Sequence, residues 1–411
     1  MTTAVLIVFC LVYLGMILGG LPFLQLDRTG IALLGAIALV AIGAVSLEEA
    51  WRAVHVPTLI LLFAFMVLSA QLRLGGFYTW VTRRVASLPL SPPALLAALV
   101  AAVAALAAVF SNDVICLAVA PVLIDACLAR RLDPVPYLLA LAMSANVGSA
   151  ATLVGNPQNM LIGETLQLSF AGYSSEALPP VVLGLGATWA LIVLFTRGRW
   201  VLADADAPPA REMERRAEGY AALEPWQAAK GLAVAAALLV AFLFTSMPRE
   251  VLALAGAGVL LMSRRLHSRH MLGLVDWQVL TLFVGLFVVN HALQTTGVPA
   301  ALVADLAQAG IRLGEPATLF GVSFVLSNVV SNVPAVMLLL PVAEHPLAGT
   351  VLALSSTLAG NLLIVGSIAN IIVVDAAARR GIAIDWRRHA LVGVPVTLAT
   401  LALAGLWLAW V

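Results

Sequence analysis

Short polar motifs interrupt two of the longest apolar stretches of the chain. Ser111-Asn112 divides the stretch near 93–128, and Ser331-Asn332 divides the stretch near 317–343. Serine and asparagine supply oxygen ligands, amide donors and side chains that can cap the start of a helix. In an apolar medium an unpaired backbone group is costly, so a helix breaks only where protein or a water-filled cavity satisfies the freed groups. We therefore expect both Ser-Asn pairs to face the protein interior and to bind substrate.

A second pair of motifs predicts two further helix breaks. The segment from Gly155 to Asn159 reads Gly-Asn-Pro-Gln-Asn, and its proline removes a donor and disfavours helical geometry at the preceding residue. The segment from Gly366 to Asn370 reads Gly-Ser-Ile-Ala-Asn and echoes the first without a proline. Each new helix start exposes about half a positive charge. The predicted substrate-binding side chains of these two segments are Asn156, Asn159, Ser367 and Asn370.

Asp113 directly follows the first Ser-Asn pair and predicts cation coupling. An ionised acid near the middle of a membrane costs roughly 2.5–3.5 kcal/mol on insertion scales, so it must be protonated, paired or bound to a cation. Lys and Arg occur only at the ends of the predicted spans. A proton or Na⁺ is then the expected partner, with oxygen ligands from Ser111, Asn112 and the break at Gly155. The alternative is that Asp113 only caps the helix that follows.

The composition excludes a soluble globular protein. Hydrophobic residues make up 62% of the 411 residues and charged residues only 10%, so most of the outer surface must face lipid. The net charge of +1 gives no basic excess for nucleic acid. The sequence holds no HExxH or GxSxG motif, and its single lysine, Lys230, cannot complete a Walker A motif. We therefore expect neither an enzyme nor a cofactor or resident metal site.

Apolar stretches near the length that crosses a bilayer predict an all-α, multi-pass protein of the plasma (cell inner) membrane. A cytoplasmic loop at 197–228 places all but three of the 22 Lys and Arg residues inside, and both termini outside. The exceptions are Arg52, Arg249 and Arg312. This charge bias does not separate re-entrant hairpins from pairs of full spans at the two Ser-Asn breaks. The ten predicted spans are 5–20, 29–45, 57–74, 136–163, 178–196, 229–246, 249–264, 277–294, 348–376 and 390–411.

The motifs recur between the two halves of the chain. Ser111-Asn112 and Ser331-Asn332 lie 220 residues apart, as do Pro121 and Pro341. Five crossings in each half, an odd number, would turn the second half upside down relative to the first. This is the inverted-repeat plan of secondary transporters, whose sites form from broken helices in corresponding positions. We therefore predict a first repeat at 1–196, a cytoplasmic linker at 197–228 and a second repeat at 229–411, each repeat with a re-entrant hairpin and a broken helix.

These paired motifs resemble those of the ion transporter superfamily, and the resemblance covers nearly the whole chain. That group includes arsenite permeases, citrate and dicarboxylate carriers of the CitMHS type, sulfate-type permeases and sodium/proton antiporters. The resemblance implies re-entrant hairpins whose tips meet the broken spans at the substrate and cation sites. It also implies an elevator-like movement of a transport region against a scaffold, within a homodimer in many members of the group.

The chain departs from the sodium-coupled carboxylate carriers at the hairpin tips, which in that branch read Ser-Asn-Thr. Here the third position is Asp113 in the first tip and Val333, followed by Pro334, in the second. The Asn-Asp pair resembles arsenite permeases and sodium/proton antiporters. The segment from Gly155 to Asn159 is more similar to the carboxylate and anion branch.

We therefore expect a secondary active transporter of a small oxyanion-type substrate, similar to an arsenite or antimonite permease and coupled to protons or Na⁺. Neutral arsenous acid would suit a site with asparagine, serine and one acid but no fixed cation. The alternatives are a sodium-coupled symporter of citrate, a dicarboxylate or an inorganic anion, which would use the helix N-termini, and a sodium/proton antiporter, which would exchange ions at Asp113.

For four further residues, a structural role is favoured over a functional one. His291 is the only histidine inside a predicted span and could relay protons, but a hydrogen bond between helices is expected. Glu164 and Asp375 follow the two broken segments at equal spacing and are expected at helix ends near the membrane surface. Cys116 could bind trivalent arsenic as a soft ligand, although we expect a small buried hydrophobic residue.

Overall fold

Helices account for nearly all of the regular structure in the described residues, which are 1–19, 25–202 and 219–411 of the computed structural model. In the N-terminal half the helices are α1 Thr2–Leu18, α2 Arg28–Ala41, α3 Leu47–Ala53, α4 Val56–Leu74, α5 Phe77–Ala86, α6 Pro92–Val109, α7 Asn112–Ala129, α8 Pro134–Ser149, α9 Pro157–Thr165 and α10 Phe170–Thr196. In the C-terminal half they are α12 Pro225–Phe244, α13 Arg249–Leu261, α14 Ser268–Leu272, α15 Trp277–Thr295, α16 Val298–Gln308, α17 Pro316–Val330, α18 Asn332–Leu339, α19 Ala348–Ala359, α20 Ile368–Ala378 and α21 Trp386–Trp410. Two short 3₁₀ turns, η2 Leu340–Val342 and η3 Ile364–Gly366, extend the second set.

Long apolar helices provide the membrane-crossing body of the protein. Within the described ranges, seven helices are long and apolar enough to cross a membrane: α4, α6, α7, α10, α12, α15 and α21. This agrees with the expected multi-pass, all-helical membrane protein. The helices α2 and α13 are shorter than the spans expected at 29–45 and 249–264, because α2 ends at Ala41 and α13 at Leu261.

Helices end and restart at all four positions where the sequence predicts a break. The chain leaves helical geometry between α6 and α7, between α8 and α9, between α17 and α18, and between α19 and α20. Asn156 accepts a hydrogen bond from the backbone N–H of Asn159 and caps α9, and Ser367 caps α20 in the same way through Ala369. Ser111 and Ser331 precede α7 and α18 without a side-chain capping bond, so capping is not their role.

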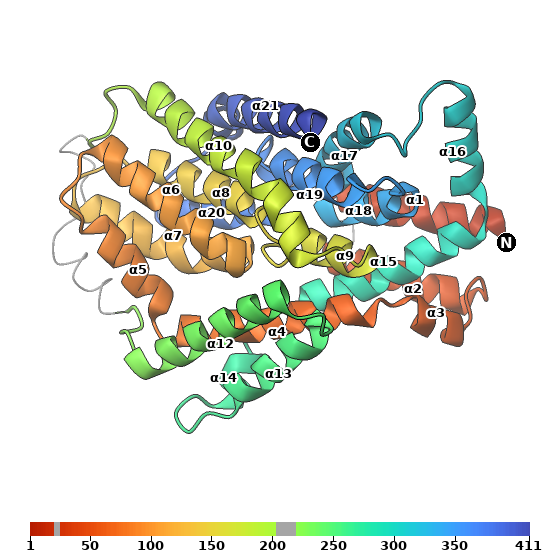
Figure 1. The fold of residues 1–411 in the computed structure, drawn as a ribbon, viewed down its shortest axis with the longest axis horizontal. Coiled ribbons are helices and arrows are strands. Elements are labelled where there is room, and N and C mark those ends of the chain that lie inside the picture. Colours follow the sequence, from red (N-terminus) through yellow and green to blue (C-terminus); the bar gives the residue numbers. More distant parts are fainter. Residues whose placement is uncertain (20–24, 203–218) are drawn as a thin grey trace.

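The broken helix of each half packs against the interrupted pair of the other half. Figure 1 shows α5, α6 and α7 toward the left of the molecule and α17 and α18 toward the right. The helix α20 packs against α7, and α9 packs against α18 and α19. Segments more than 160 residues apart in sequence therefore enclose the same central region.

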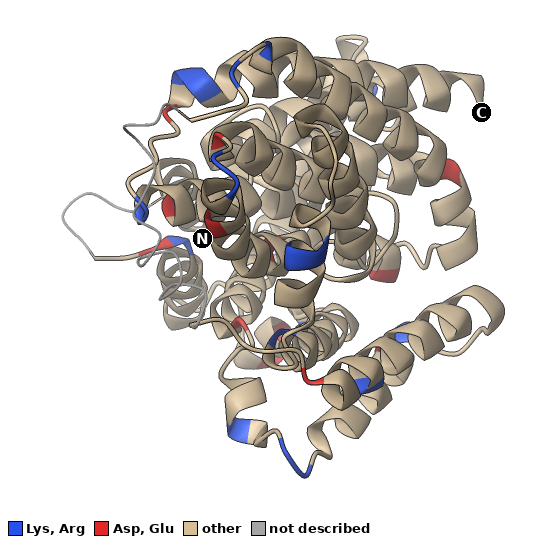
Figure 2. Ribbon diagram, turned by 90° about the vertical axis from the view of Figure 1, so that its left-hand side faces the viewer, with Lys and Arg blue, Asp and Glu red and all other residues tan. Residues whose placement is uncertain are grey.

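Charged residues gather at helix ends and in the connecting loops, as Figure 2 shows. Glu164, at the end of α9, differs from the exposed helix-end charges because it is only 3% exposed. Its Oε1 atom is 3.0 Å from Nε of Arg249 on α13. Arg249 also donates to the carbonyl of Gly163 at 2.8 Å. Glu164 therefore lies at a helix end, as expected, but tertiary packing of α9 against neighbouring helices buries it with a cation. Asp375 is 56% exposed and pairs with Arg379, as a helix-end acid should.

Candidate substrate and cation site

A network of polar side chains joins two of the four helix breaks through Asn146 on α8. Asn112, at the tip between α6 and α7, donates to Oδ1 of Asn146 on α8 at 2.9 Å. Asn146 in turn donates to Oδ1 of Asn361 at 2.8 Å and of Asn370 at 3.3 Å, and its own oxygen accepts from Ser367 at 3.0 Å. All five side chains are buried. Asn146 therefore connects the first tip to the break between α19 and α20.

A second network surrounds Thr357 on α19. Its hydroxyl accepts from the side chains of Asn156 and Gln158, each at 3.2 Å, and donates to Oδ1 of Asn159 at 3.3 Å. The amide of Asn156 also donates to Oγ of Ser149 at 3.0 Å. This network holds the break between α8 and α9 to the opposite half of the molecule.

The two networks are related by exchange. Asn146 lies on α8, before the break between α8 and α9, and hydrogen-bonds to Asn361 and Asn370 at the break between α19 and α20. Thr357 lies on α19, before that second break, and hydrogen-bonds to Asn156 and Asn159 at the break between α8 and α9. Polar groups in a low-dielectric interior are costly unless paired, so each break depends on the other half for its hydrogen bonds. The two halves therefore form one polar centre.

At the first tip, the chain is held on both sides of Asn112. Its backbone N–H donates to the carbonyl of Gly155 at 3.2 Å, so the oxygen expected to serve a cation already accepts one hydrogen bond. The partly buried carboxylate of Asp113 interacts with the backbone N–H of Ala369 in the first turn of α20. No Lys or Arg in the described part of the chain pairs with it, while Asp276 acts on it as a second negative charge.

At the second tip, the backbone is strained and the asparagine is less constrained. Ser331 has φ 79° and ψ 159°, a region that is essentially reserved for glycine and costs of order 1–3 kcal/mol for other residues. Asn332 lies against Gly360, where an added Cβ would be 3.3 Å from its Nδ2 atom. Glycine at 360 therefore leaves the space that this asparagine occupies.

Several oxygen atoms around the two tips are buried without a hydrogen-bond partner. Such atoms are uncommon in folded proteins and call for an explanation, for example a ligand or an ion. The amide oxygens of Asn112 and Asn332, which occupy matching positions in the two tips, both belong to this set. The others in this region are Oδ1 of Asn328 and the hydroxyls of Ser327 and Ser356. The described hydrogen bonds bring no Lys or Arg side chain into either network.

The structure brings together six of the eight residues expected to bind substrate. Asn112, Ser367 and Asn370 meet through Asn146, Asn156 and Asn159 meet through Thr357, and Asn332 stands beside Gly360. Ser111 and Ser331 are only partly buried, and no side-chain hydrogen bond connects either one to these networks.

Sequence reasoning missed the residues that connect the breaks. Asn146 and Thr357 belong to no motif, but they lie 211 residues apart, the same spacing that relates Asn159 to Asn370. That spacing was the available signal. Asn361 follows Gly360, which ends α19, so the sequence signal there is a helix end and not a partner for Asn146.

His389 corrects the expectation that His291 is the only histidine within a span. The helix α21 begins at Trp386, earlier than the predicted start at 390, and so includes His389. His389 is 2% exposed, and its Nε2 atom is 3.1 Å from the carbonyl oxygen of Asn361. His291 is only partly buried on α15.

Comparison with known proteins gives a consistent family. The family described as "Citrate transporter" (CitMHS) matches residues 4–351. An uncharacterized transporter of Mycobacterium tuberculosis is 30% identical, with 93% of this chain and 94% of the relative covered. The rice silicon efflux transporter (Oryza sativa subsp. japonica) is 27% identical over 93% of this chain and 92% of its own. A Dictyostelium discoideum transporter named arsB is 28% identical over 42% of this chain and 31% of its own.

Among solved structures, the Alcanivorax borkumensis YdaH transporter has a similar fold. The TM-score is 0.56 at 14% sequence identity, and the match covers 100% of this chain and 98% of the other. At this identity the likeness concerns the fold.

Proposed function

Because the chain belongs to the citrate transporter family, and is therefore a multi-pass secondary transporter of the ion transporter superfamily, we propose that it carries a small hydroxylated oxyacid. Arsenous and antimonous acid are the proposed substrates. Transport is coupled to protons or Na⁺ through Asp113, with Ser111, Asn112 and Gly155 as neighbouring ligands. The family name describes citrate, but the chemistry of the polar centre of this chain favours a neutral cargo.

The unpaired amide oxygens of Asn112 and Asn332 are the observation that carries this proposal. A neutral oxyacid presents hydroxyl groups, which donate hydrogen bonds to buried acceptors and relieve their desolvation cost. Citrate carries several negative charges and would need donors or cations in their place. The networks around Asn146 and Thr357 supply amides and hydroxyls, and no Lys or Arg hydrogen-bonds to them among the described residues.

Coupling is assigned to Asp113 because it directly follows Asn112 of the first network and forms no ion pair with a described Lys or Arg. The interaction with the N–H of Ala369 connects it to the start of α20, and the negative charge of Asp276 favours a cation between or near the two acids. A proton or Na⁺ bound here would join the first tip to the second broken helix. Substrate and cation would then stabilise the same arrangement of the breaks.

A carboxylate or inorganic anion is the second candidate, and the capped starts of α9 and α20 favour it. Each helix N-terminus presents backbone N–H groups and a partial positive charge that suit an anion.

The names of two relatives bear on the choice between an anion and a neutral oxyacid. The rice relative is named a silicon efflux transporter and the Dictyostelium relative arsB, and both names agree with a metalloid oxyacid. Sodium/proton antiport at Asp113 is the third candidate.

We extend the proposal to an inverted repeat with halves 1–196 and 229–411 and a cytoplasmic linker at 197–228, of which residues 203–218 lie outside the described residues. The Ser-Asn breaks in matching order and the exchanged bonds of Asn146 and Thr357 support it. The odd number of crossings in each half then puts both termini outside the cytoplasm. Movement is proposed as an elevator of the interrupted helices within a homodimer.

Transport by the purified protein in liposomes tests the substrate. Arsenite, antimonite, silicic acid and citrate are offered separately, with a pH or Na⁺ gradient imposed in turn. We expect gradient-driven movement of arsenite or antimonite and no inhibition by citrate. Citrate uptake driven by Na⁺, without metalloid transport, would replace this proposal with the second candidate.

A further inference from the structure

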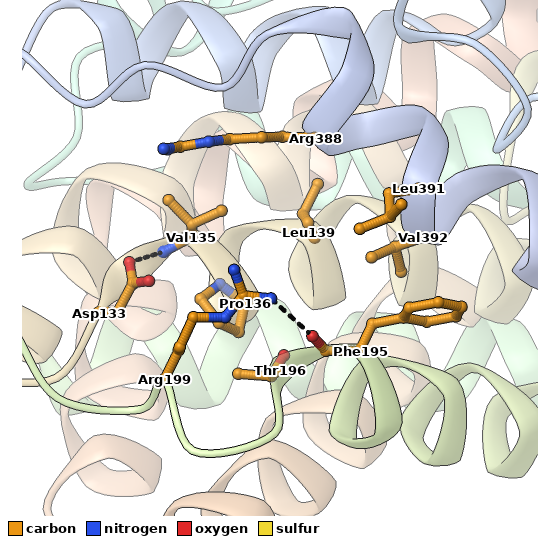
Figure 3. A pocket seen from close by; sticks show the side chains of 10 residues that line it. All are labelled: Asp133, Val135, Pro136, Leu139, Phe195, Thr196, Arg199, Arg388, Leu391 and Val392. Atoms are coloured by element: carbon orange, nitrogen blue, oxygen red, sulfur yellow. Dashed lines mark hydrogen bonds between the residues drawn. The ribbon is translucent and has the colours of Figure 1, made fainter.

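A cavity of about 220 Å³ opens at the ends of three helices, and its lining shares no residue with the two polar networks. It lies where α8 begins, where α10 ends and where α21 begins, so it is at the edge of the membrane-crossing body. Its apolar lining comes from Val135, Pro136, Leu139, Phe195, Leu391 and Val392. Figure 3 shows Arg388 on one side of this hollow and Arg199 on the other.

Both arginines retain donors for a ligand. Arg199 donates to the carbonyl of Phe195 and Arg388 to that of Ala383, each at 3.1 Å, which uses one or two of five N–H groups. Neither guanidinium forms an ion pair within the described residues. Asp133, at the rim, accepts from the backbone N–H of Val135 at 3.0 Å and so caps α8. Two guanidinium groups therefore face an apolar hollow without a bound anion among the side chains.

In a second basic cavity, cationic side chains already bind acceptors of the protein. It lies between α12 and α13 and includes Lys230, Arg264 and Arg265. Lys230 donates to the carbonyls of Leu260 and Met262 at 3.2 and 3.0 Å, and Arg265 is 3.4 Å from Glu224. Arg265 therefore has a carboxylate partner, whereas neither Arg199 nor Arg388 forms an ion pair among the described residues.

We propose that the cavity between α8, α10 and α21 binds the phosphate headgroup of an anionic phospholipid. Guanidinium groups bind phosphate in bidentate geometry, and basic pockets between membrane helices recognise such headgroups. The apolar lining and the exposed Leu391 beside it provide a path for an acyl chain. Trp386, 67% exposed with Arg387 over its ring at 5.2 Å, stands at the same end of α21 as aromatic residues do at a membrane interface. A free phosphate ion would gain nothing from the apolar lining.

The test compares two charge-matched double variants of the full-length protein in detergent. Arg199→Gln with Arg388→Gln alters the proposed site, and Arg264→Gln with Arg265→Gln removes the same charge from the second basic cavity. The unfolding midpoint is measured with added phosphatidylglycerol, phosphatidylcholine or inorganic phosphate. We expect phosphatidylglycerol to raise the midpoint of the wild type and of the control variant, and to bind the site variant ~10-fold more weakly.

Equal responses of the two variants would overturn the proposal, since surface charge in general would then explain the effect. The same midpoint shift with inorganic phosphate would overturn the assignment to a lipid. If the site variant does not fold, a photoactivatable phosphatidylglycerol on the wild type decides the question. Crosslinks within 133–139, 195–199 or 386–392 support the site, and crosslinks confined to other segments overturn it.

Discussion

The two tips differ in how firmly the rest of the protein holds them. At the first tip, Asn112 is bonded through its side chain to Asn146 and through its backbone to Gly155. At the second, Ser331 has a glycine-like backbone conformation, and the Asn332 side chain has no hydrogen bond to any described residue that would match the one from Asn112 to Asn146. The first tip also carries the acid Asp113, where the second has Val333. Residues that match in sequence therefore have unequal surroundings.

The broken helices repeat this difference. Glu164 after α9's break is buried with Arg249, whereas Asp375 in the corresponding place on α20 is exposed with Arg379. The N-terminal half thus holds its polar groups more tightly in both of its breaks. The comparison can be tested by making paired changes in the two halves.

The largest effect on stability is expected from Glu164→Gln. It leaves the guanidinium of Arg249 buried without its counter-charge, which should lower the free energy of unfolding by about 3 kcal/mol. Asp375→Asn is the matched control and should change it by less than about 0.5 kcal/mol, because exposed ion pairs contribute little. Denaturation of both variants in the same detergent measures the difference. Equal losses of unfolding free energy in the two variants would mean that burial does not increase the contribution of the Glu164–Arg249 pair.

Replacing Asp113 tests coupling. Asp113→Asn keeps the shape but removes the charge, so substrate accumulation should lose its dependence on the pH or Na⁺ gradient. One charge moved through 100 mV corresponds to about 2.3 kcal/mol, or an accumulation ratio of about 50-fold, and this factor should disappear. Exchange of substrate without a gradient should persist.

Val333→Asn places the same side chain at the matching position of the second tip and should retain the dependence on the gradient. Flux into liposomes with both gradients controlled provides the measurement. Full gradient-driven accumulation by Asp113→Asn would assign the coupling ion to another acid.

Leucine in place of the two tip asparagines should separate structure from binding. Asn112→Leu removes one of the two hydrogen bonds that Oδ1 of Asn146 accepts, so unfolding should become easier by about 1 kcal/mol in addition to loss of transport. Asn332→Leu removes a side chain whose oxygen already lacks a partner, so transport should fall while stability changes little. Thermal unfolding and arsenite flux on the same preparations distinguish the two. Equal destabilisation would contradict the difference between the tips.

The smallest effect is expected from Ser331→Gly. Glycine adopts φ 79° without a Cβ penalty, so the variant should be about 1 kcal/mol more stable, with a higher unfolding midpoint. Ser111→Gly, where φ is −44°, should not gain stability. A lower midpoint for Ser331→Gly would show that the serine side chain, and not the backbone, determines this conformation.

Much of this protein follows from the order of its residues alone. Its apolar stretches require helices in a membrane, because only helices satisfy the backbone in lipid within one segment. The Ser-Asn pairs and the proline after Asn156 predict where helices end, since these effects depend on neighbours in sequence. The family resemblance depended on the same local motifs, and the match over residues 4–351 confirms it.

Tertiary structure alone determined which polar groups meet. Asn146 and Thr357 lie in apolar helices with no motif around them, and they connect the breaks only because α8 and α19 pack beside the opposite broken helices. The burial of Glu164, the contact of His389 with Asn361 and the unpaired oxygens at the tips likewise depend on segments far apart in the chain. Local sequence sets the conformation of a break. Its hydrogen-bond partners come from helices that sequence pattern does not pair, and those partners determine its chemistry.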